Sequence, residues 1–583
     1  MKYIVSYAPH HNHFIDIEIV IKVIGAKTQV QCPAWRPGRY ELSNFAGNVR
    51  NWKAINEKGE ALQFKKITKD LWEVETANCS EMHVFYNYYA ADLNAGSTYL
   101  DDRQLYMNPV NCCMYVPELR NEPVSMEMLL PEGYRIACSM KMGTPVKTET
   151  HILHTLSASN YDELADSPLI ASPTLQVESI EVLGKLKVHI WFQGEVKPEW
   201  LKVKMHFRTF VSEQIQMMDG CPVDEYHFIY QALPYKFHHG VEHLGSTVIA
   251  IGPSYNLMKY DPFNNFLGVS CHEFFHCWNI KTIRPVEMFP YDYTKENYSR
   301  LGYVYEGVTD YYGDYLLLRS GVFSEFDYLK AVQQQIQKHF DNYGRFNLGV
   351  ADSSFDTWLD GYIQGAPYRK VSIYTEGALL AFIVDTFIRS HTNNAKSLDD
   401  VMRTLYHDFA KQGKPYSESD YWSIIEKTAG QSCKYIFDNY VNKAADLDVP
   451  LVAALDYIGL MMQTAPSKKH SERFWGMKVV EDDGKYKVTA VVPASPAEQA
   501  GICVNDEIDL VNGHSLKGNF HDWCSYYGQE QVRLSLVSQS FRRYTNVKPV
   551  EGKEFLPSFF VVKKKDATPS QKEAYKAWSR RDF

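Results

Sequence analysis

Alternating apolar and polar residues dominate the first part of the chain. From Ile15 to Val23, isoleucine and valine occupy every second position, and charged residues such as Asp16 and Glu18 stand between them. This period of two predicts a β-strand with one buried face. Shorter runs of the same kind follow, separated by turn-forming clusters of glycine, proline and asparagine. The sequence therefore predicts an all-β N-terminal domain, a sandwich or saddle-like sheet, over residues 1–170.

The pattern changes after this region. The runs 187–192 and 225–230 are typical of strands, whereas 200–218 has the longer period of a helix. Most of the later segments up to residue 455 also have helical spacing. We therefore expect residues 171–455 to form an α/β unit followed by a helical lobe, so that the whole chain belongs to the multidomain α+β class.

One helical segment carries candidate chemistry. His272-Glu273-Phe-Phe-His276 is an H-E-x-x-H motif, and its two histidines lie one turn apart on the same helical face. Two imidazoles at this spacing can hold one Zn²⁺, which leaves positions for a third ligand and a water. Glu273 can then act as a general base toward that water without being a ligand. The bare motif also arises by chance on surface or core helices, so its context decides.

The context comes thirty positions later. Glu306 opens a second helical pattern that ends at Gly321, a residue type that commonly follows a helix C-terminus. Asp310 lies one turn after Glu306. Glu306 suits the third metal ligand, and Asp310 suits an acceptor that fixes the tautomer of a ligand histidine. Two helices that both present the required groups predict a zinc site rather than a coincidence.

These two segments resemble a known family. HEFFHCWNIKTIRP and YEGVTDYYGDYLLLRSG are similar to the glycyl-aminopeptidase family of gluzincin zinc metallopeptidases, which carry a PDZ domain, and more distantly to aminopeptidase N relatives and thermolysin. The resemblance covers nearly the whole chain. It implies a thermolysin-like catalytic domain over residues 171–455 and hydrolysis of peptides from a free N-terminus, with glycine or alanine preferred. The segment 33–40 is similar to the family's N-terminal signature, where a structural aromatic corner and a substrate role are equally open.

The resemblance also implies roles for residues outside the metal motif. Gly240-Val-Glu242-His243 stands where aminopeptidase N relatives have Gly-x-Met-Glu-Asn, and the glutamate of that element binds the substrate's α-amine. Glu242 would therefore bind the ammonium group by a charge-assisted hydrogen bond, with Gly240 beside it. The spacing is one residue shorter here, and His243 replaces the asparagine. By a similar match, Tyr374 would donate a hydrogen bond to the oxyanion.

The C-terminal region predicts a third domain. The stretch 495–513 resembles the S-P-A-x-x-A-G and N-G signature of PDZ domains, which supports a PDZ-like domain over residues 456–545 and a docked tail over residues 546–583. PDZ domains add a peptide strand to a sheet edge. The loop 474–477 departs from the commonest Gly-Leu-Gly-Phe form, so both a peptide ligand and a rigid structural role are open.

Composition narrows the class of protein. The 583 residues carry a net charge of −9, which argues against a nucleic-acid partner. No apolar run reaches the length of a membrane helix, and the first residues lack the apolar core of a secretory signal. The eleven cysteines show no metal-ribbon pairing. We therefore expect a cytoplasmic protein without a membrane partner. The motif and the resemblance add the expectation of peptide substrates and one Zn²⁺ per chain.

The sequence thus predicts a zinc aminopeptidase. Two alternatives stay open at this point: another gluzincin hydrolase, such as an endopeptidase, and a non-catalytic peptide-binding scaffold. The intact set of two histidines, general base and third carboxylate favours catalysis over the scaffold.

Overall fold

The computed structural model describes residues 1–8, 10–362 and 365–583. Two compact units make up the chain. The first contains residues 1–324, 355–362 and 398–428, and the second contains residues 325–354, 363–397 and 429–583. Both candidate metal-binding helices belong to the first unit.

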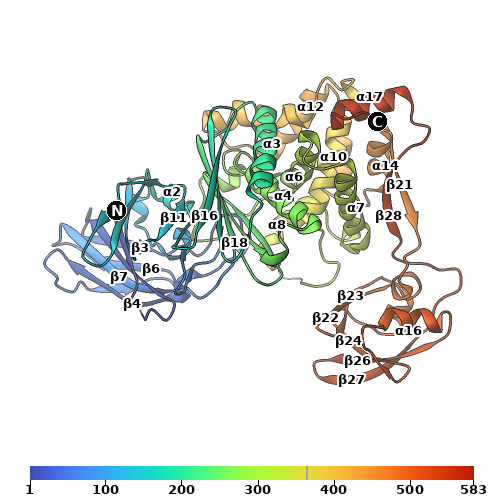
Figure 1. Cartoon of the computed structure of the whole chain (residues 1–583), viewed down its shortest axis with the longest axis horizontal. Helices are drawn as coiled ribbons and strands as arrows, with labels where there is room; N and C mark the ends of the chain where they lie inside the picture. Colours follow the sequence, from blue (N-terminus) through green and yellow to red (C-terminus); the bar gives the residue numbers. More distant parts are fainter. Residues whose placement is uncertain (9, 363–364) are drawn as a thin grey trace. The chain divides into compact units, whose positions relative to one another are not determined.

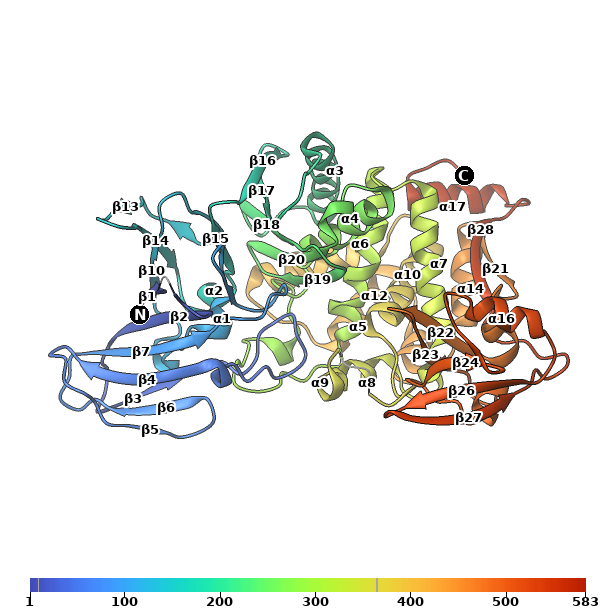
Figure 2. The same ribbon diagram turned by 60° about the horizontal axis from the view of Figure 1, so that its bottom comes forward.

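The first unit begins with the β domain that the alternation predicts. Its largest sheet has the strand order β12-β14-β10-β1-β2-β7-β4, and β13 pairs with β14 (Figure 2). Strand β2 confirms the predicted strand, because its isoleucines are buried and the residues between them are partly exposed. The strands of this sheet are β1 (Lys2–Ser6), β2 (Phe14–Lys22), β4 (Val49–Asn56), β7 (Glu81–Tyr89), β10 (Val124–Leu130), β12 (Lys141–Met142), β13 (Val146–Lys147) and β14 (Ile152–Ala158).

Two smaller sheets complete this domain. One has the order β3-β6-β5 and the other the order β11-β15-β9-β8. Short helices connect some of these strands. The elements are β3 (Lys27–Gln31), β5 (Phe64–Lys66), β6 (Leu71–Glu75), β8 (Tyr99–Leu100), β9 (Leu105–Met107), α1 (Pro109–Cys112), β11 (Arg135–Cys138), α2 (Tyr161–Ala165) and β15 (Leu169–Ser172).

A five-stranded mixed sheet supports the catalytic region. Its order is β16-β17-β18-β20-β19, in which β17, β18 and β20 are parallel and β19 forms one edge. One face packs on the N-terminal β domain through a core that includes Tyr106, Ile170, Trp191 and Val241. The strands are β16 (Gln176–Val182), β17 (Leu186–Gln193), β18 (Glu225–Ala232), β19 (Phe237–Glu242) and β20 (Ser246–Gly252).

Helices follow and surround this sheet in the first unit. Helix α3 has the bounds that the periodicity predicts, and α3, α4 and α6 contact one another. Their aromatic residues, such as Phe207 and Phe266, are fully buried. The helices are α3 (Trp200–Met218), α4 (Tyr260–Phe275), α5 (Gly302–Tyr305), α6 (Gly307–Ser320), α9 (Thr357–Asp360), α11 (Leu398–Thr404) and α12 (Glu418–Ala429).

The second unit combines helices with two sheets (Figure 1). Strands β21 and β28 pair with each other, and α7 contacts β28. These elements are α7 (Glu325–Asp341), α8 (Val350–Phe355), α10 (Ile373–His391), α13 (Lys434–Ile436), α14 (Asp448–Tyr457), β21 (Leu460–Ala465), β28 (Ser558–Lys563) and α17 (Pro569–Ser579).

A separate core marks the C-terminal sheet of the second unit. The sheet has the order β22-β23-β24-β26-β27, with β25 beside β24, and it surrounds buried residues such as Trp475 and Leu534. Strand β22 is an edge. The elements are β22 (Met477–Asp482), β23 (Lys485–Val491), α15 (Pro496–Gln499), β24 (Glu507–Val511), β25 (His514–Ser515), α16 (Phe520–Tyr527), β26 (Val532–Ser538) and β27 (Phe541–Val547).

The architecture confirms the predicted class: an N-terminal β domain, an α/β and helical catalytic region, and a small C-terminal domain. Among the described residues, no helix is both long and apolar enough to cross a bilayer.

Candidate metal centre and active site

Helix α4 carries the H-E-x-x-H motif to the metal site. Phe263, Phe266 and Phe274 are buried and anchor one face of this helix in the core. The helix ends at Phe275, so His276 is its C-cap residue and still has helical dihedral angles. The turn between His272 and His276 is therefore preserved.

Helix α6 passes close to α4 because of a glycine. A Cβ added to Gly313 would lie 3.2 Å from the Cβ of His272, which is tighter than an ordinary contact. Glu306 precedes α6 as its N-cap residue, one position after α5 ends. The predicted helix start at Glu306 is thus observed, and Gly321 follows the helix in the left-handed conformation.

The three predicted ligands meet. The Nε2 atoms of His272 and His276 lie 3.1 Å apart, and Glu306 Oε2 lies 3.8 Å and 3.4 Å from them, respectively. A tetrahedral ion with bonds of ~2.0–2.1 Å separates its ligand atoms by about 3.3 Å. The two imidazole planes are inclined at 83°, so both can point their Nε2 atoms at one position. The donor set and its geometry fit Zn²⁺.

A hydrogen bond on the outer side fixes the tautomer of neutral His276. His276 Nδ1 lies 3.0 Å from the carbonyl oxygen of Asn279, which can only accept, so Nδ1 carries the proton. Its Nε2 lone pair is then available to a metal. Asp310 Oδ1 lies 3.7 Å from His272 Nδ1, in the direction that the proposed tautomer-fixing role requires.

The general-base candidate lies beside the ligands. Glu273 is buried, and the Thr247 hydroxyl donates a 3.5 Å hydrogen bond to its Oε2. Burial raises the pKa of Glu273 above its usual range, and the nearby negative charges of Glu242 and Glu306 add to the shift. Such a carboxylate accepts a proton more readily than an exposed one.

Gly240 leaves room for this base. A Cβ at this position would lie 2.1 Å from Glu273 Oε1, so no side chain fits without displacing the carboxylate. The resemblance placed Gly240 beside the amine-binding residue; the structure adds that it borders the base.

Glu242 ends the edge strand β19 as a buried carboxylate. Only 4% of the residue is exposed, and its Oε1 is buried without a hydrogen-bond partner. Oxygen atoms of Glu242 and Glu273 and a ring nitrogen of His276 lie within 4.8 Å of one another. An unpaired buried carboxylate is costly unless a ligand pairs with it. A cationic group of a ligand would supply that partner.

A loop of the N-terminal domain completes the site. A Cβ at Gly38, whose φ is +81°, would lie 2.6 Å from Glu242 Oε2. Two residues on, the Tyr40 hydroxyl donates a 2.6 Å hydrogen bond to Glu306 Oε1. Arg36 is also buried, and this burial lowers the pKa of its guanidinium group, whereas the negative charge of Glu242 opposes the shift.

Sequence reasoning did not identify Tyr40. The segment 33–40 stood out only as a family signature with an undecided role, and among 40 tyrosines none is distinguished by composition. The aromatic corner is real, since the rings of Trp35 and Trp358 lie 5.2 Å apart. The same loop also borders the metal ligands.

Tyr374 lies in the second unit, in the first turn of α10. The Ser372 side chain caps this helix by accepting a hydrogen bond from the Thr375 N–H. Glu376, two residues after Tyr374, is buried and accepts a hydrogen bond from His339 Nδ1 at 2.7 Å. This buried ion pair joins α10 to α7.

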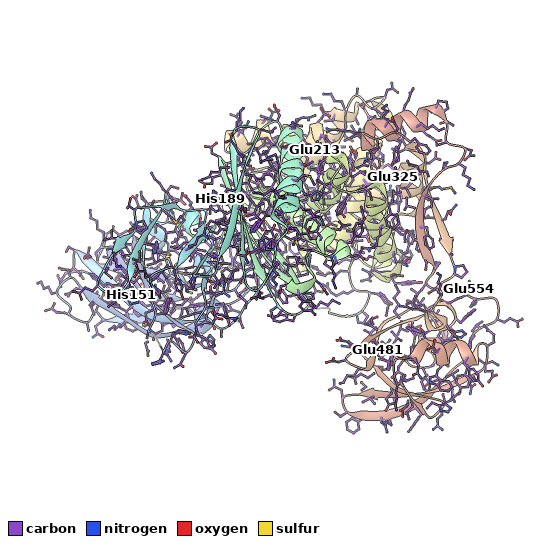
Figure 3. The ribbon with its side chains drawn as sticks, viewed as in Figure 1. His151, His189, Glu213, Glu325, Glu481 and Glu554 are labelled. Carbon is purple, nitrogen blue, oxygen red and sulfur yellow. The ribbon has the colours of Figure 1, made fainter. Side chains whose placement is uncertain are left out.

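The described residues contain a further group of metal-ligand side chains. His189 lies on β17 (Figure 3). It pairs in register with His227 on β18, and Glu225 lies beside them. His189 Nε2 and Glu225 Oε1 are 2.5 Å apart. The sequence pattern gave no sign of this cluster, because adjacent parallel strands bring the residues together.

Models of known protein domains match the chain in the same order as the domains described above. Three domain models match: the Peptidase M61 N-terminal domain over residues 2–173, M61 glycyl aminopeptidase over residues 265–380, and a PDZ domain over residues 487–538. The second range includes the three candidate ligands, Glu273 and Tyr374. No curated protein matches the chain.

Solved structures include one with the same fold. A crystal structure of an aminopeptidase N family protein from Idiomarina loihiensis is 24% identical, with a TM-score of 0.89 over 99% of each chain. A mutant M1 zinc metallopeptidase from Deinococcus radiodurans is 12% identical, with a TM-score of 0.47, over 76% of this chain and 94% of its own. In order along the chain, it therefore carries an M61 N-terminal domain, an M61 glycyl aminopeptidase domain and a PDZ domain.

Proposed function

We propose that this aminopeptidase holds one Zn²⁺ per chain through His272, His276 and Glu306 and cleaves the first peptide bond of peptides with a free N-terminus. The observation that carries the proposal is the buried Oε1 of Glu242, which has no hydrogen-bond partner and belongs to a carboxylate within 4.8 Å of a ring nitrogen of the ligand His276. A metal centre with an amine-binding carboxylate next to it suits an exopeptidase.

The residues fit the ion. Two imidazoles and one carboxylate match the donor set of catalytic zinc sites. Burial lowers the pKa of His272, which keeps it neutral. Burial also opposes the charge of His276, but the Glu306 carboxylate outweighs it and raises the pKa of His276 to about 10, so a metal would replace a proton there. A bound Zn²⁺ supplies a Lewis acid for the scissile carbonyl and makes a water acidic enough to attack near neutral pH.

The chain's own residues move the proton and hold the substrate. Glu273 accepts the proton of the attacking water and passes it to the leaving amine. Glu242 pairs with the substrate ammonium, and this anchor places the first peptide bond at the metal. Tyr374 donates a hydrogen bond to the oxyanion; its sequence match to the family supports this role.

The family indicates a small N-terminal residue, glycine or alanine. Gly38 packs against Glu242 and Gly240 packs against Glu273, so a side chain at either glycine would displace one of the two carboxylates. Peptides whose N-terminal side chain is larger than a methyl group are expected to be poor substrates.

The PDZ domain adds a second peptide-binding surface in this proposal. Strand β22 is a free edge of its sheet, and a peptide strand can pair with such an edge. The loop before it is helical, and its Gly476 N–H donates to the Ser471 carbonyl. This N–H is therefore not available to a peptide carboxylate, which favours an internal peptide segment over a free C-terminus as the ligand.

Two further parts of the proposal concern the whole chain. We keep the division into residues 1–170, 171–455, 456–545 and 546–583. The C-terminal sheet supports the third range, because β22 to β26 lie within 456–545 and β27 ends at Val547. We also propose a cytoplasmic location. All eleven cysteines are free thiols, as proteins of a reducing compartment generally have.

The test is the hydrolysis of Gly- and Ala-p-nitroanilide beside their N-acetylated forms, with and without a chelator. We expect cleavage of the free-amine substrates alone, abolished by the chelator. Equal cleavage of the acetylated substrates would make the protein an endopeptidase. A zinc-loaded sample that cleaves neither form would contradict a catalytic function.

A further inference from the structure

We propose that Tyr40, contributed by the N-terminal β domain, is a positioning residue of the metal centre: its hydroxyl holds one oxygen of Glu306, so that only the other oxygen faces the two histidines. The inference rests on the proposed zinc site. It makes the N-terminal domain a working part of the active site.

The two oxygens of Glu306 have different surroundings. Oε1 accepts a 2.6 Å hydrogen bond from the Tyr40 hydroxyl. Oε2 lies 3.4 Å from His276 Nε2 and 3.8 Å from His272 Nε2. The hydrogen bond therefore fixes the rotation of the carboxylate, so that only Oε2 would face a bound metal.

Packing prevents the tyrosine from turning away. Only 2% of Tyr40 is exposed. Its ring lies 5.5 Å from that of Tyr305, the residue before Glu306, and 6.0 Å from that of Trp358, which it meets edge-on. The hydroxyl thus reaches Glu306 from a rigid aromatic group, which keeps the loss of conformational entropy small.

Backbone hydrogen bonds tie the loop to the segment that follows the zinc helix. The N–H groups of Ala34 and Trp35 both donate to the Tyr293 carbonyl, at 2.8 Å and 3.2 Å. The N–H groups of Ser43 and Asn44 return to the Ala34 carbonyl and close the loop. Tyr40 lies within this closed loop, so its position is set by both the N-terminal domain and the catalytic region.

Removal of the hydroxyl has a defined consequence. In Tyr40→Phe, Glu306 Oε1 becomes a buried acceptor without a partner, and the carboxylate can rotate. Loss of a partner that orients a metal ligand typically costs ~10–100-fold in metal affinity or activity. The same range is expected here.

The experiment measures the Zn²⁺ affinity of the full chain by competition with a chromophoric chelator, for the wild type and Tyr40→Phe. We expect zinc to bind ~10–100-fold more weakly to the variant, and kcat for Gly-p-nitroanilide to fall while KM changes less than about twofold. The matched control is Tyr86→Phe, which also removes a 2.6 Å bond from a buried hydroxyl of the N-terminal domain, here to the Cys112 carbonyl. The control should bind zinc like the wild type.

Replacement of zinc by Co²⁺ gives a second readout. The visible spectrum of the cobalt form reports coordination number, and we expect Tyr40→Phe to change it because the freed carboxylate can bind through both oxygens. Equal zinc affinity and equal cobalt spectra in Tyr40→Phe and wild type would overturn the inference alone. A wild-type protein that binds no zinc would overturn the proposed function itself, so the two failures are distinguishable.

Discussion

Two clusters in the first unit contain the same residue types, two histidines and one glutamate. One lies on α4 and before α6, and the other lies on the adjacent strands β17 and β18; their members are His272, His276 and Glu306, and His189, His227 and Glu225, respectively. Both place their ligand atoms within 4.8 Å of one another. Composition and proximity therefore do not separate them.

The orientation of the imidazole rings distinguishes the two clusters. The helix histidines are inclined at 83°, whereas the strand histidines are stacked at 22° with centroids 4.7 Å apart. A metal bonds to imidazole in the plane of the ring, and two nearly parallel planes share no nearby point. Strand pairing in register stacks side chains, whereas a helical turn lets them converge.

Hydrogen bonding separates them again. In the helix cluster, His276 donates from Nδ1 to a carbonyl and keeps the Nε2 lone pair. In the strand cluster, the Trp191 indole, which can only donate, bonds to His227 Nδ1 at 3.1 Å. The proton of neutral His227 is then on Nε2, which faces Glu225 and cannot bind a metal. A metal site therefore requires ring nitrogens whose lone pairs are free and point toward one position.

The largest expected effect comes from ligand removal. His276→Ala should lose the bound zinc and bring activity to the level of the chelator-treated enzyme, because two ligands do not hold the ion. The matched substitution in the other cluster, His227→Ala, should leave the zinc content at one per chain. Metal analysis and Gly-p-nitroanilide hydrolysis measure both. Loss of zinc in His227→Ala would break the distinction between the clusters.

Next comes the general base. Glu273→Gln should lower kcat by at least ~10²–10⁴-fold while zinc stays bound, since the residue moves a proton and is not a ligand. Steady-state kinetics together with metal analysis on the same sample provide the check. Unchanged turnover in this variant would rule out the mechanism.

A smaller effect is expected at the amine site. Glu242→Gln keeps the shape of the side chain but loses the charge-assisted hydrogen bond to the substrate ammonium, so kcat/KM for Gly-p-nitroanilide should fall about 10–100-fold. Zinc content should stay constant. A variant as active as the wild type on free-amine substrates would remove Glu242 from the site.

The smallest expected effect is on the pH dependence of stability, and it concerns the strand cluster. Burial lowers the pKa of His227 to about 3, and the charge of His189 adds to the shift. The unfolded histidine, with a pKa of ~6.5, takes up a proton first as the pH falls. Stability from this group is therefore complete above pH ~6.5 and decreases on acidification, by about 2 kcal/mol at pH 5.

Hydrogen exchange of the β17 and β18 amides at pH 7 and pH 5 measures this effect. His227→Gln should reduce the loss of stability between pH 7 and pH 5 by about 2 kcal/mol and leave zinc binding unchanged. The remaining loss comes from other histidines with lowered pKa values, such as His189 and His239. An identical pH dependence in the variant and the wild type would show that another group titrates.

Local patterns in the sequence predict much of the fold. The helix over 200–218, the strand near Ile15–Val23 and the C-cap at Gly321 all follow from periodicity and capping residues, because each depends on neighbours in the chain. The candidate ligands on α4 and before α6 can be predicted from the sequence for the same reason.

The remaining features depend on contacts between distant residues. Tyr40 and Glu306 are 266 positions apart, and no local pattern connects them. The stacking of His189 on His227 depends on the register of two parallel strands, which a period of two does not specify. The unpaired state of Glu242 is likewise visible only once its surroundings are known.

The most direct test of this account is an anomalous difference map, recorded at the zinc absorption edge from crystals grown with Zn²⁺. The account predicts a single strong peak ~2.0–2.2 Å from the Nε2 atoms of His272 and His276 and from Glu306 Oε2, with none at the strand cluster. An empty helix cluster, or a peak between His189 and His227, would contradict it.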